Sequence, residues 1–441
     1  MLKRKIETYI EEFLGSRPQK ILVLDGARQT GKTFIIRQVG KKLFKNYVEI
    51  NMLDDSLNER NFADGLSVSA FYLQLSALAG NKLGNKEDTL VFLDEIQAYP
   101  HLLTLLKFLN QDNRYTYIAS GSELGVTLFK TLSIPMGSIE VRHLYPLDFE
   151  EFLWANGVGT EVIDHCREMF LTHQSLQENL HRRMIDLFKK YLLVGGLPEA
   201  VQSFVNDTNI AVVRRIQSQI HEYYGIDASK YDQENRLKIR RIYDMIPSIL
   251  ENKKKRIVAR DIEGMASKRY KDYQDEFDYL IASGIALDVK AISTPVFPLV
   301  ESMSKNLLKL YLNDVGMLTG ILYRNNINPI LNDECSVNLG TVYESVVAQE
   351  LKAHGFRLFY YDNKKNGEVD FLIDDYEQLT VFPLEVKSGK DYYEHSALNH
   401  FLTNKDYSVK QAIVFCNERT VEEKDGVTYM PIYNVMFLQA E

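Results

Sequence analysis

The sequence predicts an α/β protein whose first part is built on a parallel β-sheet. Three apolar runs, at 21–24, 89–93 and 115–119, have the composition of buried strands. Strands of a parallel sheet are covered on both faces, so they read as continuous apolar runs without polar alternation. A segment with helical spacing of apolar residues, 33–39, follows the first run. At about 150 residues per domain, the 441 residues suggest about three domains.

A glycine-rich loop follows the first apolar run. Residues 26–33 have the spacing G-x-x-x-x-G-K-T and lead into the segment with helical spacing. Glycines let backbone N–H groups surround phosphate oxygens, and a helix N-terminus adds partial positive charge. Lys32 would reach the β- and γ-phosphates, and the Thr33 hydroxyl would hold Mg²⁺. The loop therefore predicts an ATP site made by Gly26, Ala27, Arg28, Gln29, Thr30, Gly31, Lys32 and Thr33.

Polar residues follow the other two apolar runs. Asp94 and Glu95 end the second run, at the strand edge where ligands of such sheets bind. Asp94 suits coordination of Mg²⁺, and Glu95 suits a general base that polarises the attacking water. Ser120 ends the third run and could sense the γ-phosphate, although a Ser-Gly turn after a strand is an equal alternative.

Weaker patterns complete this first domain, which we expect over residues 1–147. Residues 2–14 have the spacing of an amphipathic helix, 54–88 are mixed and mainly helical, and 47–51 and 139–146 are expected strands. The α/β part then covers about 15–147.

Composition limits the classes of partner and compartment. The net charge of −8 means that contact with nucleic acid requires a local basic surface. The isolated Cys166, Cys335 and Cys416 indicate neither a disulfide framework nor a zinc site, and they fit a reducing compartment. Without a signal-like or membrane-spanning apolar run, we expect a soluble, cytoplasmic protein with no membrane contact.

Residues 236–290 are the basic part of the chain. The overlapping stretch 211–270 holds 14 Lys and Arg against 8 Asp and Glu. Helical patterns at 237–249, 257–266 and 268–282, followed by a strand at 284–292, have the order of a winged helix. Lys268, Arg269 and Lys271 would open its recognition helix and face phosphates or base edges. A solvated basic face with a protein-binding or lid role is an equal alternative.

A second set of charged residues lies near the C-terminus. A helix at 340–351 carries Glu344, and strands at 356–361, 367–373 and 381–387 precede a helix at 394–403 and a strand at 411–416. Glu385 and Lys387 share one strand face, and Asp370 on the neighbouring strand can converge with them. Asp and Glu-x-Lys in this αβββαβ order are typical of Mg²⁺-dependent phosphodiester hydrolysis, in which carboxylates hold the cation and lysine orients water.

Four motifs together resemble a family of prokaryotic AAA-type ATPases: residues 26–33, 93–97, 120–122 and 144–152. In that family a winged helix and a restriction-endonuclease-like domain of unsettled function follow the ATPase. The resemblance implies an ATPase domain at 1–147, a helical lid at 148–235, a winged helix at 236–325 and a nuclease-like domain at 326–441. Asp370, Glu385, Lys387 and Glu344 match the family's motif.

The resemblance also bears on two details of the ATP site. Pro198, in Gly-Gly-Leu-Pro, would lie against adenine, although a helix stop followed by a Pro-started helix is an equal alternative. Relatives commonly carry Arg directly after the Gly that precedes the fifth strand, whereas Ser138 follows Gly137 here. No arginine finger can therefore be assigned, and Arg142 would point along the strand.

Two functions follow as hypotheses. In the first, binding and hydrolysis of ATP with Mg²⁺ control a C-terminal Mg²⁺-dependent nuclease that acts on DNA or RNA. Its catalytic residues are Glu95, Asp370, Glu385, Lys387 and Glu344, and its metal ligands are Thr33, Asp94, Asp370 and Glu385. In the second, the protein is an ATP-dependent switch whose nuclease-like domain only binds a protein or nucleic-acid partner. An oligomer is compatible with either function.

Overall fold

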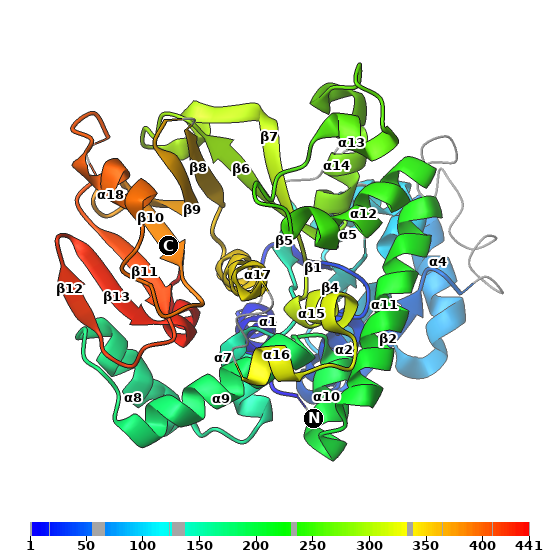
Figure 1. Cartoon of the computed structure of the whole chain (residues 1–441). Coiled ribbons are helices and arrows are strands. Elements are labelled where there is room, and N and C mark those ends of the chain that lie inside the picture. The colour runs from blue at the N-terminus through cyan, green and yellow to red at the C-terminus, as the bar shows by residue number, and fades with distance from the viewer. Residues whose placement is uncertain are drawn as a thin grey trace. The chain divides into compact units, whose positions relative to one another are not determined.

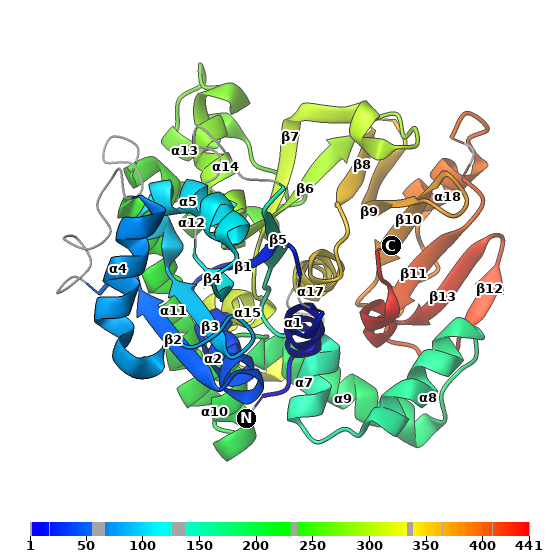
Figure 2. The ribbon, with the colours of Figure 1, turned by 180° about the vertical axis from the view of Figure 1, so that it is seen from behind.

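The computed structural model describes residues 2–16, 18–54, 67–122, 124–125, 137–230, 236–332, 338–363, 365–407 and 409–440. Cys335 and much of the expected 54–88 segment lie outside these residues. The chain divides into two compact units (Figures 1 and 2). The N-terminal unit comprises 3–145 with 282–284, and the C-terminal unit comprises 1–2, 146–281 and 285–441. Within the described ranges, every helix is too short or too polar to cross a membrane.

The N-terminal unit contains a five-stranded sheet in which all neighbouring strands are parallel, in the order β2-β3-β4-β1-β5. This confirms the predicted α/β class. The strands are β1 (Ile21–Asp25), β2 (Asn46–Asn51), β3 (Thr89–Asp94), β4 (Thr116–Ser120) and β5 (Ile139–His143). The helices are α1 (Lys5–Gly15), α2 (Lys32–Leu43), α4 (Val68–Ala79), α5 (Pro100–Asp112) and the short turns η1 (Gly80–Lys82) and η2 (Ile96–Ala98).

Helices cover both faces of this sheet, as the apolar strands require. On one face Ile10 and Leu14 of α1 and Ile35, Ile36 and Val39 of α2 pack on β1, β3 and β4. On the other face, buried side chains of α4 and α5 pack on the alternate residues of the same strands. Successive side chains of a strand point to opposite faces, so one apolar run supplies both cores.

The C-terminal unit begins with helices and ends with a sheet. The helices are α7 (Phe149–Ala155), α8 (Thr160–Leu171), α9 (Glu178–Val194), α10 (Pro198–Asp207), α11 (Ile210–Lys230), α12 (Arg236–Leu250), α13 (Ala259–Glu263), α14 (Gln274–Ala282), α15 (Val315–Tyr323), α16 (Asn328–Leu331), α17 (Leu339–Ala353) and α18 (Ser396–Thr403). Three short 3₁₀ turns are η3 (Tyr270–Tyr273), η4 (Leu299–Ser302) and η5 (Ile432–Phe437).

The sheet of this unit has eight strands in the order β12-β13-β11-β10-β9-β8-β6-β7 (Figure 1). The strands are β6 (Ala286–Ile292), β7 (Met303–Leu312), β8 (Phe359–Asn363), β9 (Gly367–Asp375), β10 (Thr380–Val386), β11 (Ala412–Cys416), β12 (Glu422–Lys424) and β13 (Val427–Pro431). The sequence order α17-β8-β9-β10-α18-β11 is the expected αβββαβ order. α18 packs on one face of this sheet, and α17 contacts β6, β7 and β10.

The basic stretch is arranged differently from the prediction in two respects. Strand β6 pairs in parallel with β8, so β6 and β7 belong to the same sheet as the C-terminal strands, and the expected boundary at 325 passes through one sheet. Lys268 and Arg269 precede the 3₁₀ turn η3 and do not open a helix, because α14 begins only at Gln274. The division into four domains stays a prediction.

The Gly195-Gly196 pair is explained by close backbone packing. Gly195 has φ +70°, and a Cβ there would lie 2.2 Å from Oδ1 of Asp314. A Cβ on Gly196 would lie 2.0 Å from the carbonyl oxygen of Leu147. The Gly196 N–H donates to the buried Asp314 carboxylate at 2.6 Å, and the Leu147 N–H donates to the Gly196 carbonyl at 2.7 Å. These contacts explain the two glycines by packing, and the role of Pro198 stays a prediction.

Candidate functional site

The loop between β1 and α2 has the backbone that a phosphate-binding loop needs. Gly26 has φ +143°, and a Cβ there would lie 2.4 Å from the Leu144 carbonyl oxygen. Gly31 has φ +96° and forms the N-cap of α2, while Gln29 also has a positive φ of 63°. Ala27 and Thr30 are buried, Arg28 is half-buried, and Gln29 is exposed. The loop therefore leads directly into the N-terminus of a helix that packs one face on the sheet, as predicted.

Lys32 lies inside this loop. Its ammonium donates to the carbonyl oxygens of Gly26 and Ala27, each at 2.8 Å, and only 6% of the residue is exposed. Burial lowers the pKa of Lys32, and the nearby Glu95 carboxylate is the largest influence in the opposite direction. Two backbone carbonyls of the loop thus hold the ammonium, and acidic side chains lie near enough to favour its charged form.

Asp94 connects the ends of three structural elements. It ends β3, and its carboxylate accepts hydrogen bonds from the Thr33 hydroxyl, at 3.0 Å, and from the Ser120 hydroxyl. Because β4 lies between β1 and β3, the end of β4 places Ser120 next to the acid. Burial raises the pKa of Asp94, while the Ser120 and Thr33 hydrogen bonds oppose that shift. The structure thus brings Thr33, Asp94 and Ser120 together.

Glu95 is held by residues that sequence reasoning did not select. Its backbone is left-handed, with φ +56°, and its carboxylate accepts from Ser122 at 3.1 Å and from Gln97. Gln97 also donates to the Ser122 hydroxyl at 3.1 Å. Ser122 stands in the Ser-Gly-Ser sequence after β4, so this signal was available, but only Ser120 was singled out.

Arg4 is a third residue that sequence reasoning missed, and its side chain binds the backbone of the phosphate loop. This arginine precedes α1 and is only 4% exposed. Its guanidinium donates to the Thr30 carbonyl at 3.0 Å and to the Tyr145 carbonyl at 2.8 Å. The contact spans 26 residues of sequence, and no local pattern indicates it.

Arg142 and Pro198 are the two other residues that the sequence raised in connection with the ATP site. Arg142 on β5 pairs with Glu140 of the same strand at 3.2 Å and lies over the Tyr9 ring of α1 at 4.7 Å. Pro198 is the first residue of α10 in the C-terminal unit.

The second predicted site lies on β9 and β10 of the C-terminal unit. These strands are antiparallel, with Leu384 opposite Phe371, so Glu385 faces Asp370 across the pair. The Asp370 carboxylate accepts from the Val386 N–H at 2.9 Å, and the Lys387 ammonium lies 3.0 Å from Oε1 of Glu385. The structure brings Asp370, Glu385 and Lys387 together, as the period of two along a strand predicts.

Glu344 reaches the same cluster from α17, together with two lysines that the sequence did not indicate. The Glu344 carboxylate pairs with Lys255 and accepts from the Tyr311 hydroxyl at 3.3 Å. Lys309 on β7 is fully buried, pairs with Glu368 and lies 4.5 Å from the centre of the Tyr360 ring. Lys309 reaches the cluster because β7 pairs with β6, which pairs with β8, and Lys255 comes from the turn before α13.

The carboxylates of this cluster strongly affect one another. Burial, and then the charges of Glu344 and Glu385, raise the pKa of Asp370 well above its usual range. Burial also raises the pKa of Glu385, opposed by Lys387. Burial would lower the pKa of Lys387, but Glu385, Asp370 and Glu344 together raise it. A cation among these acids is therefore favoured, and lysines already supply part of that charge.

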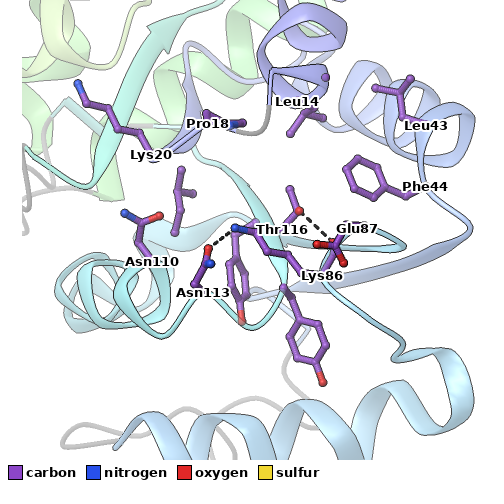
Figure 3. A pocket seen from close by; sticks show the side chains of 14 residues that line it. Leu14, Pro18, Lys20, Leu43, Phe44, Lys86, Glu87, Asn110, Asn113 and Thr116 are labelled. Atoms are coloured by element: carbon purple, nitrogen blue, oxygen red, sulfur yellow. Dashed lines mark hydrogen bonds between the residues drawn. The ribbon is translucent and has the colours of Figure 1, made fainter.

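Metal-binding side chains and one cavity of the N-terminal unit also bear on a ligand site. Among the described residues, no group of three or more His, Cys, Asp or Glu side chains is placed to hold a metal ion. A cavity of about 310 Å³ lies at the amino ends of β1 and β4, away from the phosphate loop (Figure 3). There Lys86 donates to Asn113, and Thr116 donates to the Lys86 carbonyl at 3.2 Å. No phosphate-loop residue lines this cavity.

Comparison with known proteins agrees with the first site. Residues 18–153 match a family model described as an AAA domain, so the chain contains an AAA-type, ATPase-like P-loop domain. Residues 185–327 and 339–435 match two models described as domains of unknown function. An uncharacterized protein of Methanocaldococcus jannaschii is 24% identical over 366 residues, which cover 81% of this chain and 72% of that protein.

Two solved structures have lower sequence identity to this chain than that relative has. A Walker-type ATPase of Pyrococcus abyssi is 14% identical with a TM-score of 0.44, over 72% of this chain and 95% of that one. The ORC2 protein of Aeropyrum pernix is 13% identical with a TM-score of 0.35, over 76% and 95%.

Proposed function

We propose that the N-terminal unit binds and hydrolyses ATP with Mg²⁺. The observation that carries this proposal is the meeting of Thr33, Asp94 and Ser120 next to Lys32 in a loop with left-handed glycines. The Thr33 hydroxyl and Asp94 carboxylate are hard oxygen ligands 3.0 Å apart, so they fit Mg²⁺. Bound there, the ion would neutralise charge on the β- and γ-phosphates.

The remaining groups of this unit have roles that follow from their contacts. Lys32 binds the phosphates by turning its ammonium away from the Gly26 and Ala27 carbonyls. Glu95 takes a proton from the attacking water, and Ser122 and Gln97 orient its carboxylate. Ser120, whose hydroxyl donates to Asp94, senses whether the γ-phosphate is present.

We also propose that the C-terminal carboxylate cluster cleaves phosphodiester bonds in nucleic acid under control of the ATP site. Asp370 and Glu385 face each other across one strand pair, which is a donor set that Mg²⁺ accepts. A bound metal would stabilise charge that develops on the phosphate. Lys387 orients the attacking water beside Glu385, and Glu344 completes the outer side of the cluster from α17.

One observation favours the second candidate, a switch whose C-terminal site binds a partner without cutting. Lys255 pairs with Glu344, and Lys387 pairs with Glu385. Lysines thus neutralise two carboxylates that would otherwise attract a metal. Buried ion pairs of this kind also occur in a purely structural role.

One matrix of cleavage assays distinguishes the two candidate functions. Wild type and Asp370→Ala are incubated with single- and double-stranded DNA and RNA, with Mg²⁺ and with ATP, ADP or no nucleotide. A nuclease cuts at least one substrate, and Asp370→Ala abolishes cutting while phosphate release from ATP continues. If the wild type never cuts in any combination, the nuclease proposal is wrong and the binding switch stands. Absence of phosphate release from ATP in the wild type refutes the first proposal independently.

A further inference from the structure

Four consecutive basic residues, Lys253–Arg256, form a turn beside the carboxylate cluster. Two hydrogen bonds fix the backbone on either side of them. The Thr341 hydroxyl at the start of α17 donates to the Leu250 carbonyl at 3.0 Å. The Ile257 N–H donates to the Leu308 carbonyl at 2.9 Å. The turn is therefore attached to the helix that carries Glu344 and to β7, the strand that carries Lys309.

The four cations divide into two inward and two outward side chains. Lys255 pairs with Glu344 and Arg256 pairs with Asp362 on β8, and these lysine and arginine side chains are 15% and 23% exposed. Lys253 and Lys254 are exposed, and neither forms an ion pair with a residue in the described ranges. Because consecutive Cα atoms lie about 3.8 Å apart, Lys253 and Lys254 begin within about 8 Å of a residue that touches the cluster.

This arrangement leaves exposed positive charge next to the carboxylate cluster. Four like charges in one turn repel one another, and the ion pairs with Glu344 and Asp362 neutralise only half of them. Lys268, which the sequence favoured as a nucleic-acid contact, lies 3.7 Å from Glu263 and stacks over Tyr273. Its charge is therefore partly satisfied within the protein.

We propose that Lys253 and Lys254 form a phosphate-binding site that holds the backbone of a nucleic-acid strand next to the carboxylate cluster. The site rests on the function proposed for that cluster. The inward pair fixes the turn, and the outward pair contacts phosphate oxygens as point charges. Such contacts position a strand and carry no sequence information.

Binding of a fluorescein-labelled 20-nucleotide DNA, single- or double-stranded, tests the proposal by anisotropy. The full chain is titrated in EDTA over a range of salt concentrations, so binding is measured without cleavage. Lys253→Ala/Lys254→Ala should weaken binding and reduce the slope of log affinity against log salt. The expected reduction is about 1.4 for single strands and about 1.8 for duplex, since each phosphate contact contributes roughly 0.7 or 0.9.

The matched control is Lys405→Ala/Lys410→Ala, which removes the same charge from exposed positions of the same unit. It should leave the slope unchanged. Equal weakening by both variants, or no DNA binding by the wild type, overturns the proposal. Because the assay excludes metal, failure of the nuclease proposal appears only in the cleavage matrix and leaves this result interpretable.

Discussion

Arg4 gives a quantitative test of how the phosphate loop is held. Its buried guanidinium donates to the Thr30 and Tyr145 carbonyls at 3.0 and 2.8 Å. Hydrogen bonds to a charged group contribute about 1.5–3 kcal/mol each. Loss of both in Arg4→Ala should lower the free energy of unfolding of the N-terminal unit by about 3–6 kcal/mol. Arg4→Lys keeps the charge but not the fork of donors, so it should lose about half as much.

Urea unfolding followed by far-UV circular dichroism measures this change. The single tryptophan, Trp154, lies in the C-terminal unit, so its fluorescence serves as an internal control. We expect the variants to shift the dichroism transition more than the fluorescence transition. Ordinary surface substitutions change the free energy of unfolding by at most about 0.5 kcal/mol. A change of that size in Arg4→Ala would refute the claim that Arg4 stabilises the phosphate loop.

Three further predictions concern both units. Gly196→Ala should destabilise the protein by more than about 3 kcal/mol, because its Cβ would lie 2.0 Å from the Leu147 carbonyl oxygen. Gly389 has open space around it, so Gly389→Ala should be near neutral in the same urea titration. Burial raises the pKa of Asp314 from 3.8 to about 6. Stability that is present below about pH 4 should therefore fall by about 3 kcal/mol as the pH rises to about 6.5, and an equal fall in Asp314→Asn would contradict this. Glu95→Gln should bind ATP but release phosphate at least about 100-fold more slowly, and an unchanged rate would remove Glu95 from the role of base.

The sequence predicted the parts of both sites that depend on local spacing. The loop from Gly26 to Thr33 is one continuous motif. Asp94 meets Thr33 because carboxyl ends of parallel strands share one edge of a sheet. Asp370, Glu385 and Lys387 converge because side chains alternate along neighbouring strands.

The missed residues depend on long-range pairing. Arg4 contacts Thr30 only through tertiary packing, and Lys309 reaches Glu368 because β6 pairs with β8. Strand β7, which carries Lys309, was not predicted. Helical spacing at 268–282 was interpreted as one helix, but the structure begins with the 3₁₀ turn η3 before α14. No single-sequence pattern distinguishes these outcomes, because propensity is a weak guide where packing decides.

Calorimetric titration of ATP with Mg²⁺ tests the central claim most directly. The wild type should bind, and Lys32→Ala should lose at least about tenfold in affinity, because one charge-assisted hydrogen bond contributes about 1.5–3 kcal/mol and tenfold is about 1.4 kcal/mol. Lys45→Ala, which removes an exposed charge just after the same helix, should bind as the wild type does. Equal ATP affinity in wild type and Lys32→Ala would contradict the assignment of residues 26–33 as the nucleotide site.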